Sequence, residues 1–209
     1  MKVLLINGSP KPAGSTFTAL KRVADTLEAN GIETEIFHVG VKPIAGCMGC
    51  GYCSKSGYGK CVNGSDTVNE VLDKLADFDG FVFGSPVHYA AASGMLTSFL
   101  DRLFYAGKKN LMFKPGAAVV CCRRGGATAA LDQITKYFTI SNMPVVASQY
   151  WNMVHGSNPE QVVQDLEGMQ TMEVIGKNMA WLLKCIEAGK KQGINIPELE
   201  PKQTTSFIR

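Results

Sequence analysis

Residues 2–16 read KVLLINGSPKPAGST, a short apolar run followed by a loop rich in glycine, proline and hydroxyl residues. An apolar run of this length that ends in a Gly/Pro turn is typical of a strand buried on both faces. Behind the loop, apolar residues recur at helical spacing until Asn30-Gly31. The stretch therefore predicts a strand, a loop and a helix, the repeating unit of an α/β protein. The apolar helix positions are Phe17, Leu20, Val23, Ala24 and Leu27.

The same alternation continues along the rest of the chain. Strands that alternate with helices predict one domain with a parallel sheet covered by helices on both faces. We expect this domain to span residues 1–191, with residues 192–209 as an irregular C-terminal tail. The expected strands are residues 2–6, 33–39, 80–83, 116–122 and 144–148, and the helices after the first are residues 68–75, 94–105, 128–139 and 159–189.

Composition and charge narrow the class of protein. With 209 residues, 45% of them hydrophobic, the chain can bury one substantial core without disulfides. A formal net charge of +3 gives no basic surface for nucleic acid. The apolar run at the N-terminus is too short for an export signal or a membrane span. We therefore expect a cytoplasmic protein with no nucleic-acid or membrane partner, in a reducing compartment where clustered thiols bind metal or react.

Ligands of open parallel sheets bind beyond the carboxyl ends of the strands. Three strand-to-helix loops lie there in the predicted fold, at residues 7–16, 84–93 and 121–128. The second loop is rich in small residues and carries two flat side chains, His88 and Tyr89. Backbone groups of such a loop can approach the edge of a planar heterocycle while an aromatic side chain packs on its face. A solvated histidine and a surface tyrosine are the competing interpretation.

The first loop has the composition of a phosphate site. It leads into a helix N-terminus, where free N–H groups and the helix dipole favour an anion. Ser9, Ser15 and Thr16 add hydroxyl donors, and Lys11 adds charge. The loop is neither a Walker A loop nor a G-x-G-x-x-G fingerprint, so it suits a terminal phosphate such as that of FMN. The competing interpretation is an ordinary turn with a Ser/Thr helix cap.

Four of the seven cysteines fall within one glycine-rich segment, residues 46–62, which we interpret as an insertion into the domain. Their spacing, C-x2-C-x2-C-x7-C, can point four thiolates at one small volume. Such a donor set favours an iron–sulfur cluster or zinc, although zinc sites usually pair two C-x2-C hooks; the third interpretation is a metal-free segment. The candidate ligands are Cys47, Cys50, Cys53 and Cys61, whereas Cys121, Cys122 and Cys185 lie in apolar patterns and are expected in the core.

Four parts of the sequence together resemble one known family. They are Gly8-Ser9-Pro10-Lys11 with Gly14-Ser15-Thr16, the cysteine segment, Gly84-Ser85-Pro86-Val87-His88-Tyr89, and Asp101-Arg102. Over roughly residues 1–185 the chain is similar to the NADPH-dependent FMN reductase-like branch of the flavodoxin-like superfamily, and its cysteine spacing is similar to that of iron–sulfur flavoproteins. The resemblance implies an α/β three-layer sandwich with a five-stranded parallel sheet in the order 2-1-3-4-5. It also implies non-covalently bound FMN that receives hydride from NAD(P)H.

The resemblance also assigns site residues. No side chain is expected to be catalytic, because the flavin carries the chemistry. The family commonly has arginine and asparagine where this chain has Lys11 and Ser15. The FMN phosphate would be held by Ser9, Lys11, Ser15 and Thr16 with Phe17 beside them, the isoalloxazine ring would be lined by Pro86, Val87, His88 and Tyr89, and its pyrimidine edge would be contacted by Arg123, Gly125 and Gly126.

These observations predict an FMN-dependent NAD(P)H oxidoreductase of the flavin or quinone reductase type. Electrons would pass from the nicotinamide cofactor through FMN to a small acceptor or to a [4Fe-4S] cluster on the cysteine segment. Two alternatives are a non-enzymatic flavin/iron–sulfur electron carrier between partner proteins, and a zinc-stapled interaction or sensor module without flavin. We also expect a homodimer or a tetramer, in which the tail ending Ser206-Phe207-Ile208-Arg209 docks on a second subunit.

Overall fold

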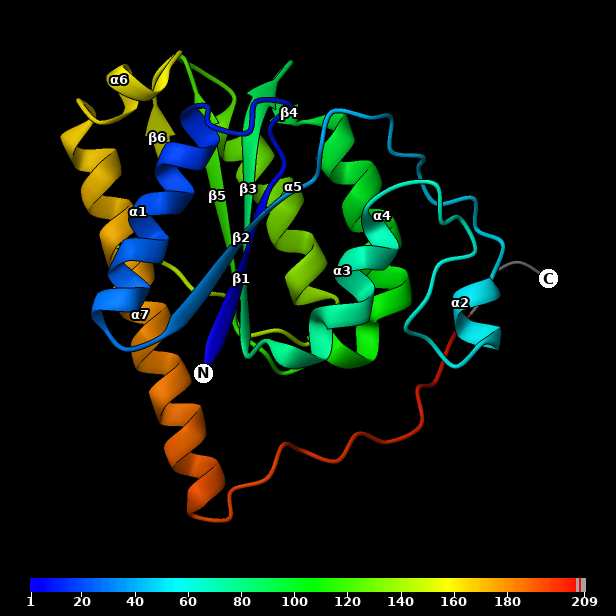
Figure 1. Cartoon of the computed structure of the whole chain (residues 1–209). Helices are drawn as coiled ribbons and strands as arrows, with labels where there is room; N and C mark the ends of the chain where they lie inside the picture. Colours follow the sequence, from blue (N-terminus) through cyan, green and yellow to red (C-terminus); the bar gives the residue numbers. More distant parts are fainter. Residues whose placement is uncertain (206, 208–209) are drawn as a thin grey trace.

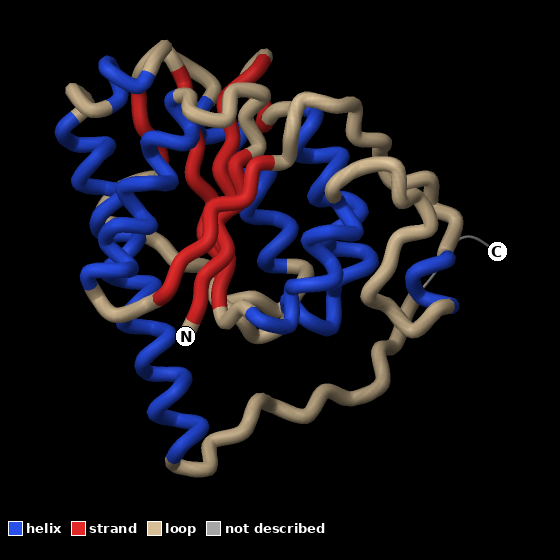
Figure 2. Tube along the Cα trace, in the orientation of Figure 1, coloured by secondary structure: helices blue, strands red, loops and turns tan. Residues whose placement is uncertain are grey.

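The computed structural model describes residues 1–205 and 207. Its central sheet has the strand order β2-β1-β3-β5-β6, and the short strand β4 pairs with β3. All neighbouring strands are parallel except β3 and β4, which are antiparallel. Without β4, the parallel strands run in the chain order 2-1-3-4-5, which confirms the predicted sheet (Figures 1 and 2). The strands are β1 (Lys2–Asn7), β2 (Glu33–His38), β3 (Gly80–His88), β4 (Ala91–Ala92), β5 (Gly116–Cys122) and β6 (Met153–His155).

Helices cover both faces of the sheet. Figure 1 shows α1, α6 and α7 on one face and α3, α4 and α5 on the other. The short helix α2 lies outside this sandwich, within the cysteine segment. The helices are α1 (Ser15–Ala29), α2 (Tyr52–Lys55), α3 (Val68–Lys74), the 3-10 helix η1 (Leu75–Asp77), α4 (Gly94–Leu111), α5 (Ala127–Thr139), α6 (Pro159–Val162) and α7 (Leu166–Lys191).

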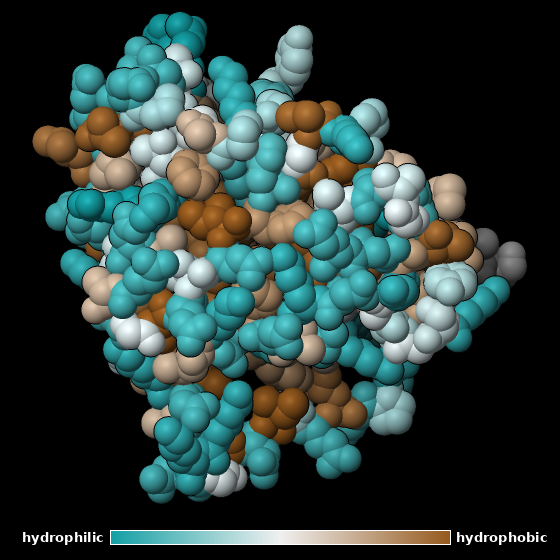
Figure 3. Space-filling view, viewed as in Figure 1, coloured by the Kyte–Doolittle hydropathy of each residue, from teal (hydrophilic) through white to brown (hydrophobic). Residues whose placement is uncertain are grey.

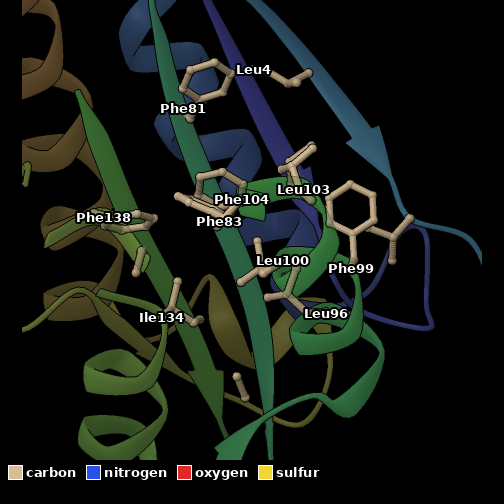
Figure 4. Close-up of a cluster of buried hydrophobic side chains, with 14 of the residues drawn as sticks. Leu4, Phe81, Phe83, Leu96, Phe99, Leu100, Leu103, Phe104, Ile134 and Phe138 are labelled. Carbon is tan, nitrogen blue, oxygen red and sulfur yellow. The ribbon is translucent and has the colours of Figure 1, made fainter. Parts of the chain in front are cut away.

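The apolar run of β1 is buried on both faces, as predicted. Val3 and Leu5 pack in the core beneath α1 and α7, whereas Leu4 and Ile6 pack in the core beneath α4 and α5. None of these four side chains is exposed, at 0% each. Burial on both faces explains why the run is continuously apolar rather than alternating. The core beneath α4 and α5, drawn in Figure 4, contains the aromatic residues Phe81, Phe83, Phe99, Phe104 and Phe138.

The strand expected at residues 144–148 is wrong. Val145 makes only an isolated bridge to β5, and strand β6 begins later, at Met153. Between them residues 147–151 leave the sheet. The buried Asn152 side chain closes this excursion by donating a hydrogen bond of 3.2 Å to Val146 O at its start. An apolar pattern reports burial but does not report backbone pairing, so the sequence pattern places the strand too early.

The helix expected over residues 159–189 is two helices, α6 and α7. Asp165 separates them, because its Oδ1 accepts a hydrogen bond from Gly168 N at 3.0 Å and caps α7. Asn158 caps α6 in the same way, accepting from Gln161 N at 2.9 Å. Each cap satisfies an N–H group that a helix start leaves without a partner, so the second helix starts afresh at its own cap.

The cysteine segment lies against the outer side of α4 (Figure 1). The tail has no helix or strand from residue 192 to residue 205 and runs back toward this segment, where Lys202 lines the same cavity as the cysteines. Ser206, Ile208 and Arg209, where the tail was expected to dock on a second subunit, lie outside the described residues. On the face in Figure 3, hydrophilic side chains predominate and hydrophobic ones form separate patches. No helix in the described part of the chain is long and apolar enough to cross a membrane.

Candidate functional site

The loop between β1 and α1 is fixed by the buried side chain of Asn7. Its Nδ2 donates a hydrogen bond to Pro12 O at 3.1 Å, and its Oδ1 accepts one from Ser9 N at 3.1 Å. Gly8 N donates to Gly84 O at 2.9 Å and so ties the loop to β3. Only glycine fits at this crossing, since a Cβ on Gly8 would lie 2.7 Å from a side-chain carbon of α4. The shape of the loop is therefore set by the chain's own contacts.

The residues predicted to hold a phosphate lie on this loop and in the first turn of α1. Ser9 is buried, and its Oγ accepts a hydrogen bond from Lys11 N at 3.1 Å. No side chain among the described residues caps α1, whose N-cap is Gly14, so the competing interpretation of a Ser/Thr helix cap is wrong. A helix start without a side-chain cap keeps its N–H groups available to an anion. Of these four residues, Ser9 and Thr16 are buried, Ser15 is half-buried and Lys11 is exposed; Phe17, predicted to lie beside them, is half-buried.

A histidine that the sequence pattern does not single out supports the same loop. His38 ends β2, and its Nε2 lies 2.8 Å from Ser9 O. A carbonyl oxygen can only accept a hydrogen bond, so Nε2 carries the ring hydrogen and donates this bond to Ser9 O. Asn7 and His38 are paired in the parallel ladder of β1 and β2, so both lie at the carboxyl edge of the sheet. The signal that could find His38 is therefore its position at the end of the strand beside β1, which requires the sheet order.

The loop after β3 is a tight β-hairpin with a strained turn. Strand β4 pairs back onto the end of β3, which leaves Tyr89 and Ala90 as a two-residue turn. Their φ angles are +50° and +59°, as in a type I′ turn, where asparagine and glycine are strongly preferred. A left-handed conformation costs a residue other than glycine about 1–2 kcal/mol. Strain of this kind clusters at functional sites.

The hairpin carries the residues predicted to line a flavin ring. Tyr89, at its tip, is 106% exposed, and His88 is exposed as well. Pro86 and Val87 are half-buried at its base. The structure thus places Tyr89 at the rim of the carboxyl edge with an open ring face, and its contact with a flavin stays a prediction.

The third predicted loop packs against the hairpin. Gly126 has a φ of +85°, and a Cβ on it would lie 2.5 Å from Ala90 Cα, so only glycine lets the two loops meet. Ser93, which the sequence pattern does not assign to the site, joins the hairpin to the first loop because its Oγ donates to Gly8 O at 2.8 Å. The three predicted loops therefore meet at one edge of the sheet. Arg123 and Gly125 of the third loop are exposed.

The four cysteines of the segment share one cavity. A space of about 570 Å³ lies between the segment, α4 and the end of α5, and it is lined by Cys47, Cys50, Cys53 and Cys61. All four thiols are free. Among the described residues, however, no three His, Cys, Asp or Glu side chains are gathered closely enough to hold a metal ion. The structure therefore brings the predicted ligands to one cavity but does not converge them on one point.

The wall of this cavity contains two polar residues of α4, Asp101 and Arg102, and Tyr137 of α5. The hydroxyl of Tyr137 donates a hydrogen bond of 2.5 Å to Asp101 Oδ1. Burial and the Asp101 carboxylate both raise the pKa of Tyr137 well above its ordinary value, so this phenol stays protonated. Arg102, the next residue, is buried and contacts the cysteine segment through Cys61.

The remaining cysteines are not part of this cavity. Cys121 and Cys122 are buried in β5, and burial raises the pKa of the Cys121 thiol to about 11. Burial also raises the pKa of Cys122. Both are therefore protonated core thiols with little nucleophilic character. The expectation of a buried Cys185 is wrong, because this residue lies on the exposed side of α7.

A comparison with known protein families identifies the family of this chain. The sequence pattern of the family described as NADPH-dependent FMN reductase matches residues 1–158. The chain belongs to this family. An iron–sulfur flavoprotein of Methanocaldococcus jannaschii is 33% identical over 196 residues, which cover 90% of this chain and 100% of that protein. An iron–sulfur flavoprotein of Methanosarcina thermophila is 27% identical, with 91% of this chain and 99% of that protein covered.

Solved structures of FMN reductase and flavodoxin type share the fold. A flavodoxin from the domain Archaea superimposes with a TM-score of 0.60 over 88% of this chain and 99% of that chain, at 14% identity. An NADH:FMN oxidoreductase in its apo form superimposes with a TM-score of 0.63 over 87% of this chain and 89% of that chain, at 17% identity. At such identities the likeness establishes the flavodoxin-like fold.

The residues at the carboxyl edge fit FMN, the cofactor of the family. The uncapped start of α1 with Ser9, Ser15 and Thr16 offers N–H and hydroxyl donors to a phosphate. The contact of Gly126 with the hairpin places backbone groups of two loops together, where the edge of a planar ring can reach them. The cysteine segment supplies four free thiols, the number and kind of donor that an iron–sulfur cluster takes, although the described side chains do not converge on one point.

Proposed function

We propose that this protein is an FMN-dependent NAD(P)H oxidoreductase that passes electrons through FMN to a small acceptor or to an iron–sulfur cluster. Membership of the NADPH-dependent FMN reductase family supports the first part, and the relatives named iron–sulfur flavoproteins support the second. Bound FMN supplies the redox chemistry, since it accepts two electrons and a proton as hydride and can release the electrons one at a time.

The observation that carries this proposal is the connection of three loops at the carboxyl ends of β1, β3 and β5. Gly8 bonds to Gly84, Ser93 bonds to Gly8, and Gly126 packs on Ala90, so each loop is fixed by its neighbours. A site prepared in this way binds a ligand without ordering flexible loops, which would weaken binding.

The chain's own residues have three roles in this proposal. Ser9, Ser15, Thr16 and the start of α1 bind the phosphate, and the exposed Lys11 adds a charge beside it. The hairpin with Tyr89 packs on the flavin ring and limits the access of water to one of its faces. Arg123 places a cation near the pyrimidine edge, where it stabilises the negative charge of reduced flavin.

The four cysteines of the segment would hold the cluster and receive single electrons. Cys47 and Cys50 are exposed, and Gly49 and Gly51, which flank Cys50, have φ angles of +64° and +68°. Glycine takes many backbone conformations at small energetic difference, so this part of the segment can close on a cluster when iron is present.

Anaerobic purification with FMN, iron and zinc analysis tests the proposal. We expect one FMN per chain, the visible bands of a flavin, stoichiometric iron after reconstitution, and steady oxidation of NADPH or NADH with a quinone as acceptor. Cys50→Ser should lose the iron and keep the FMN. Cys185→Ser, which removes an exposed thiol outside the segment, should keep both.

Three outcomes contradict parts of the proposal. Protein that stays colourless after reconstitution with FMN rules out the flavin function. Protein that is reduced only through a partner protein, and never by NAD(P)H directly, is an electron carrier rather than an oxidoreductase. Stoichiometric zinc that iron cannot replace identifies the cysteine segment as a zinc site.

A further inference from the structure

Arg102 is the largest fully buried side chain of the described residues. It lies on α4, and only 1% of its side chain is exposed. Arginine is rarely buried to this degree unless its donors are all paired, because transfer of the charge from water carries a large penalty. The contacts of Arg102 therefore indicate the role of the buried guanidinium.

All of these contacts are with the cysteine segment and the residues that flank it. Nη1 forms an ion pair with Asp66 and donates to Ala45 O at 3.2 Å. Nη2 donates to Asn63 O at 2.5 Å. Nε donates to Cys61 Sγ at 3.2 Å. One guanidinium thus binds both ends of the segment and one of its four sulfur atoms.

The bond to sulfur is not needed to fix the backbone of Cys61. Cys61 N donates to Asn69 Oδ1 at 2.8 Å, and Asn69 Nδ2 donates to Cys61 O at 3.0 Å. In the described part of the chain, no other cysteine sulfur accepts a hydrogen bond from a charged donor. The sulfur of Cys47 accepts only from Gly49 N, at 3.5 Å. The contribution of Arg102 Nε is therefore specific to the Cys61 sulfur.

We propose that Arg102 is a positioning residue that orients the Cys61 sulfur toward the cavity and makes an iron–sulfur cluster bound there easier to reduce. This inference rests on the proposed function, because it requires the cluster. A one-electron reduction, with reduced FMN as the donor, adds a negative charge to the cluster. A hydrogen bond and a positive charge at a ligand sulfur stabilise that charge, so they raise the reduction potential.

The geometry favours an effect on the potential over a purely structural role. The Asp66 carboxylate pairs with Nη1, whereas the sulfur contact uses Nε. The ion pair offsets part of the charge, but it leaves the directional N–H···S bond intact. A lysine at this position keeps the charge for Asp66 and has no planar fork with which to reach the sulfur and two carbonyl groups together.

The test compares the reduction potential of the cluster in three reconstituted proteins. Unchanged protein, Arg102→Lys and Lys108→Met are titrated anaerobically, with iron content and the electron paramagnetic resonance of the reduced cluster as readouts. Lys108 lies on the same helix and lines the same cavity, so its variant removes a charge without touching sulfur. We expect Arg102→Lys to shift the balance toward the oxidised cluster about tenfold, or about 59 mV for one electron, and Lys108→Met to shift it much less.

The outcomes separate this inference from the proposed function. Unchanged protein that binds no iron contradicts the cluster itself and, with it, the role of Arg102. Arg102→Lys with full iron content and an unchanged potential contradicts the role of Arg102 alone. If Arg102→Lys does not fold, the same titration is made on Arg102→Met with Asp66→Asn, which leaves no unpaired buried charge. An unchanged potential in that double variant also contradicts the inference, and a lowered one supports it.

Discussion

His38 is a single residue that supports a loop in which it does not itself lie. Its Nε2 holds the carbonyl of Ser9, so one imidazole fixes the middle of the loop that we expect to bind the FMN phosphate. In His38→Ala the loop loses this donor, and we expect the Kd for FMN to rise about tenfold, as for the loss of one hydrogen bond of about 1–1.5 kcal/mol. The Kd for riboflavin, which has no phosphate, should change less than about twofold. Flavin fluorescence measures both constants.

His155→Ala is the matched control for this prediction. His155 is exposed and lies at the end of β6. Strands β3 and β5 separate β6 from β1, so His155 is far from the phosphate loop along the sheet. Its removal should leave both flavin affinities unchanged. An equal loss of FMN and riboflavin affinity in His38→Ala would show that the histidine supports the whole edge rather than the phosphate loop.

At the level of the elements, the contact between the hairpin and the start of α5 requires a residue without a Cβ at position 126. Gly126→Ala would place a Cβ 2.5 Å from Ala90 Cα at a φ of +85°. We expect a loss of about 2–3 kcal/mol in the free energy of unfolding, from the left-handed conformation and the displaced hairpin, and so a Tm about 4–12 °C lower. Gly125→Ala is the control, because no atom in the part of the chain that the structure describes lies within 4 Å of a Cβ there. Thermal unfolding of both apo variants measures the difference, and equal Tm values would contradict this packing.

The sequence predicts a strand correctly where the buried apolar residues are also the ones whose backbone pairs with a neighbouring strand. The run at Val3–Ile6 is apolar because both faces of β1 are covered, and its pattern alone defines a strand. Val145 is also in an apolar run, and Pro144 and Val146 beside it still bond to Gly116. Residues 147–151 then leave the sheet, and the bonds to β5 resume only at Asn152. The contacts of His38 and Ser93 join residues far apart in the chain, so no local pattern contains them. The spacing of the cysteines suggests that their sulfur atoms meet at one point. The four residues do line one cavity, but among the described residues they are not gathered closely enough to hold a metal ion.

At the scale of the whole molecule, we propose that the chain assembles as a homodimer or tetramer. Tyr150 and Trp151 project from the excursion with 52% and 56% of their surface exposed, and their ring centroids are 5.0 Å apart. Rigid exposed aromatic pairs are enriched at protein interfaces. We expect light scattering at micromolar concentration to give at least twice the monomer mass, and Trp151→Glu to shift it toward the monomer. Leu166→Glu, at a residue 79% exposed on α7, is the control. A monomeric unchanged protein would contradict the proposal.

The excursion has a consequence for solubility. Beyond β5 the outer border of the sheet consists of the bridge at Val145 and of residues 152–155, which include β6, with residues 147–151 standing off between them. Aggregation by strand addition requires a continuous row of unpaired N–H and C=O groups along such a border. Among the described residues this border offers no such row, so we expect that a neighbouring chain would not extend the sheet across it. We therefore expect the protein to resist growth into fibrous stacks on this side when it is concentrated or newly synthesised.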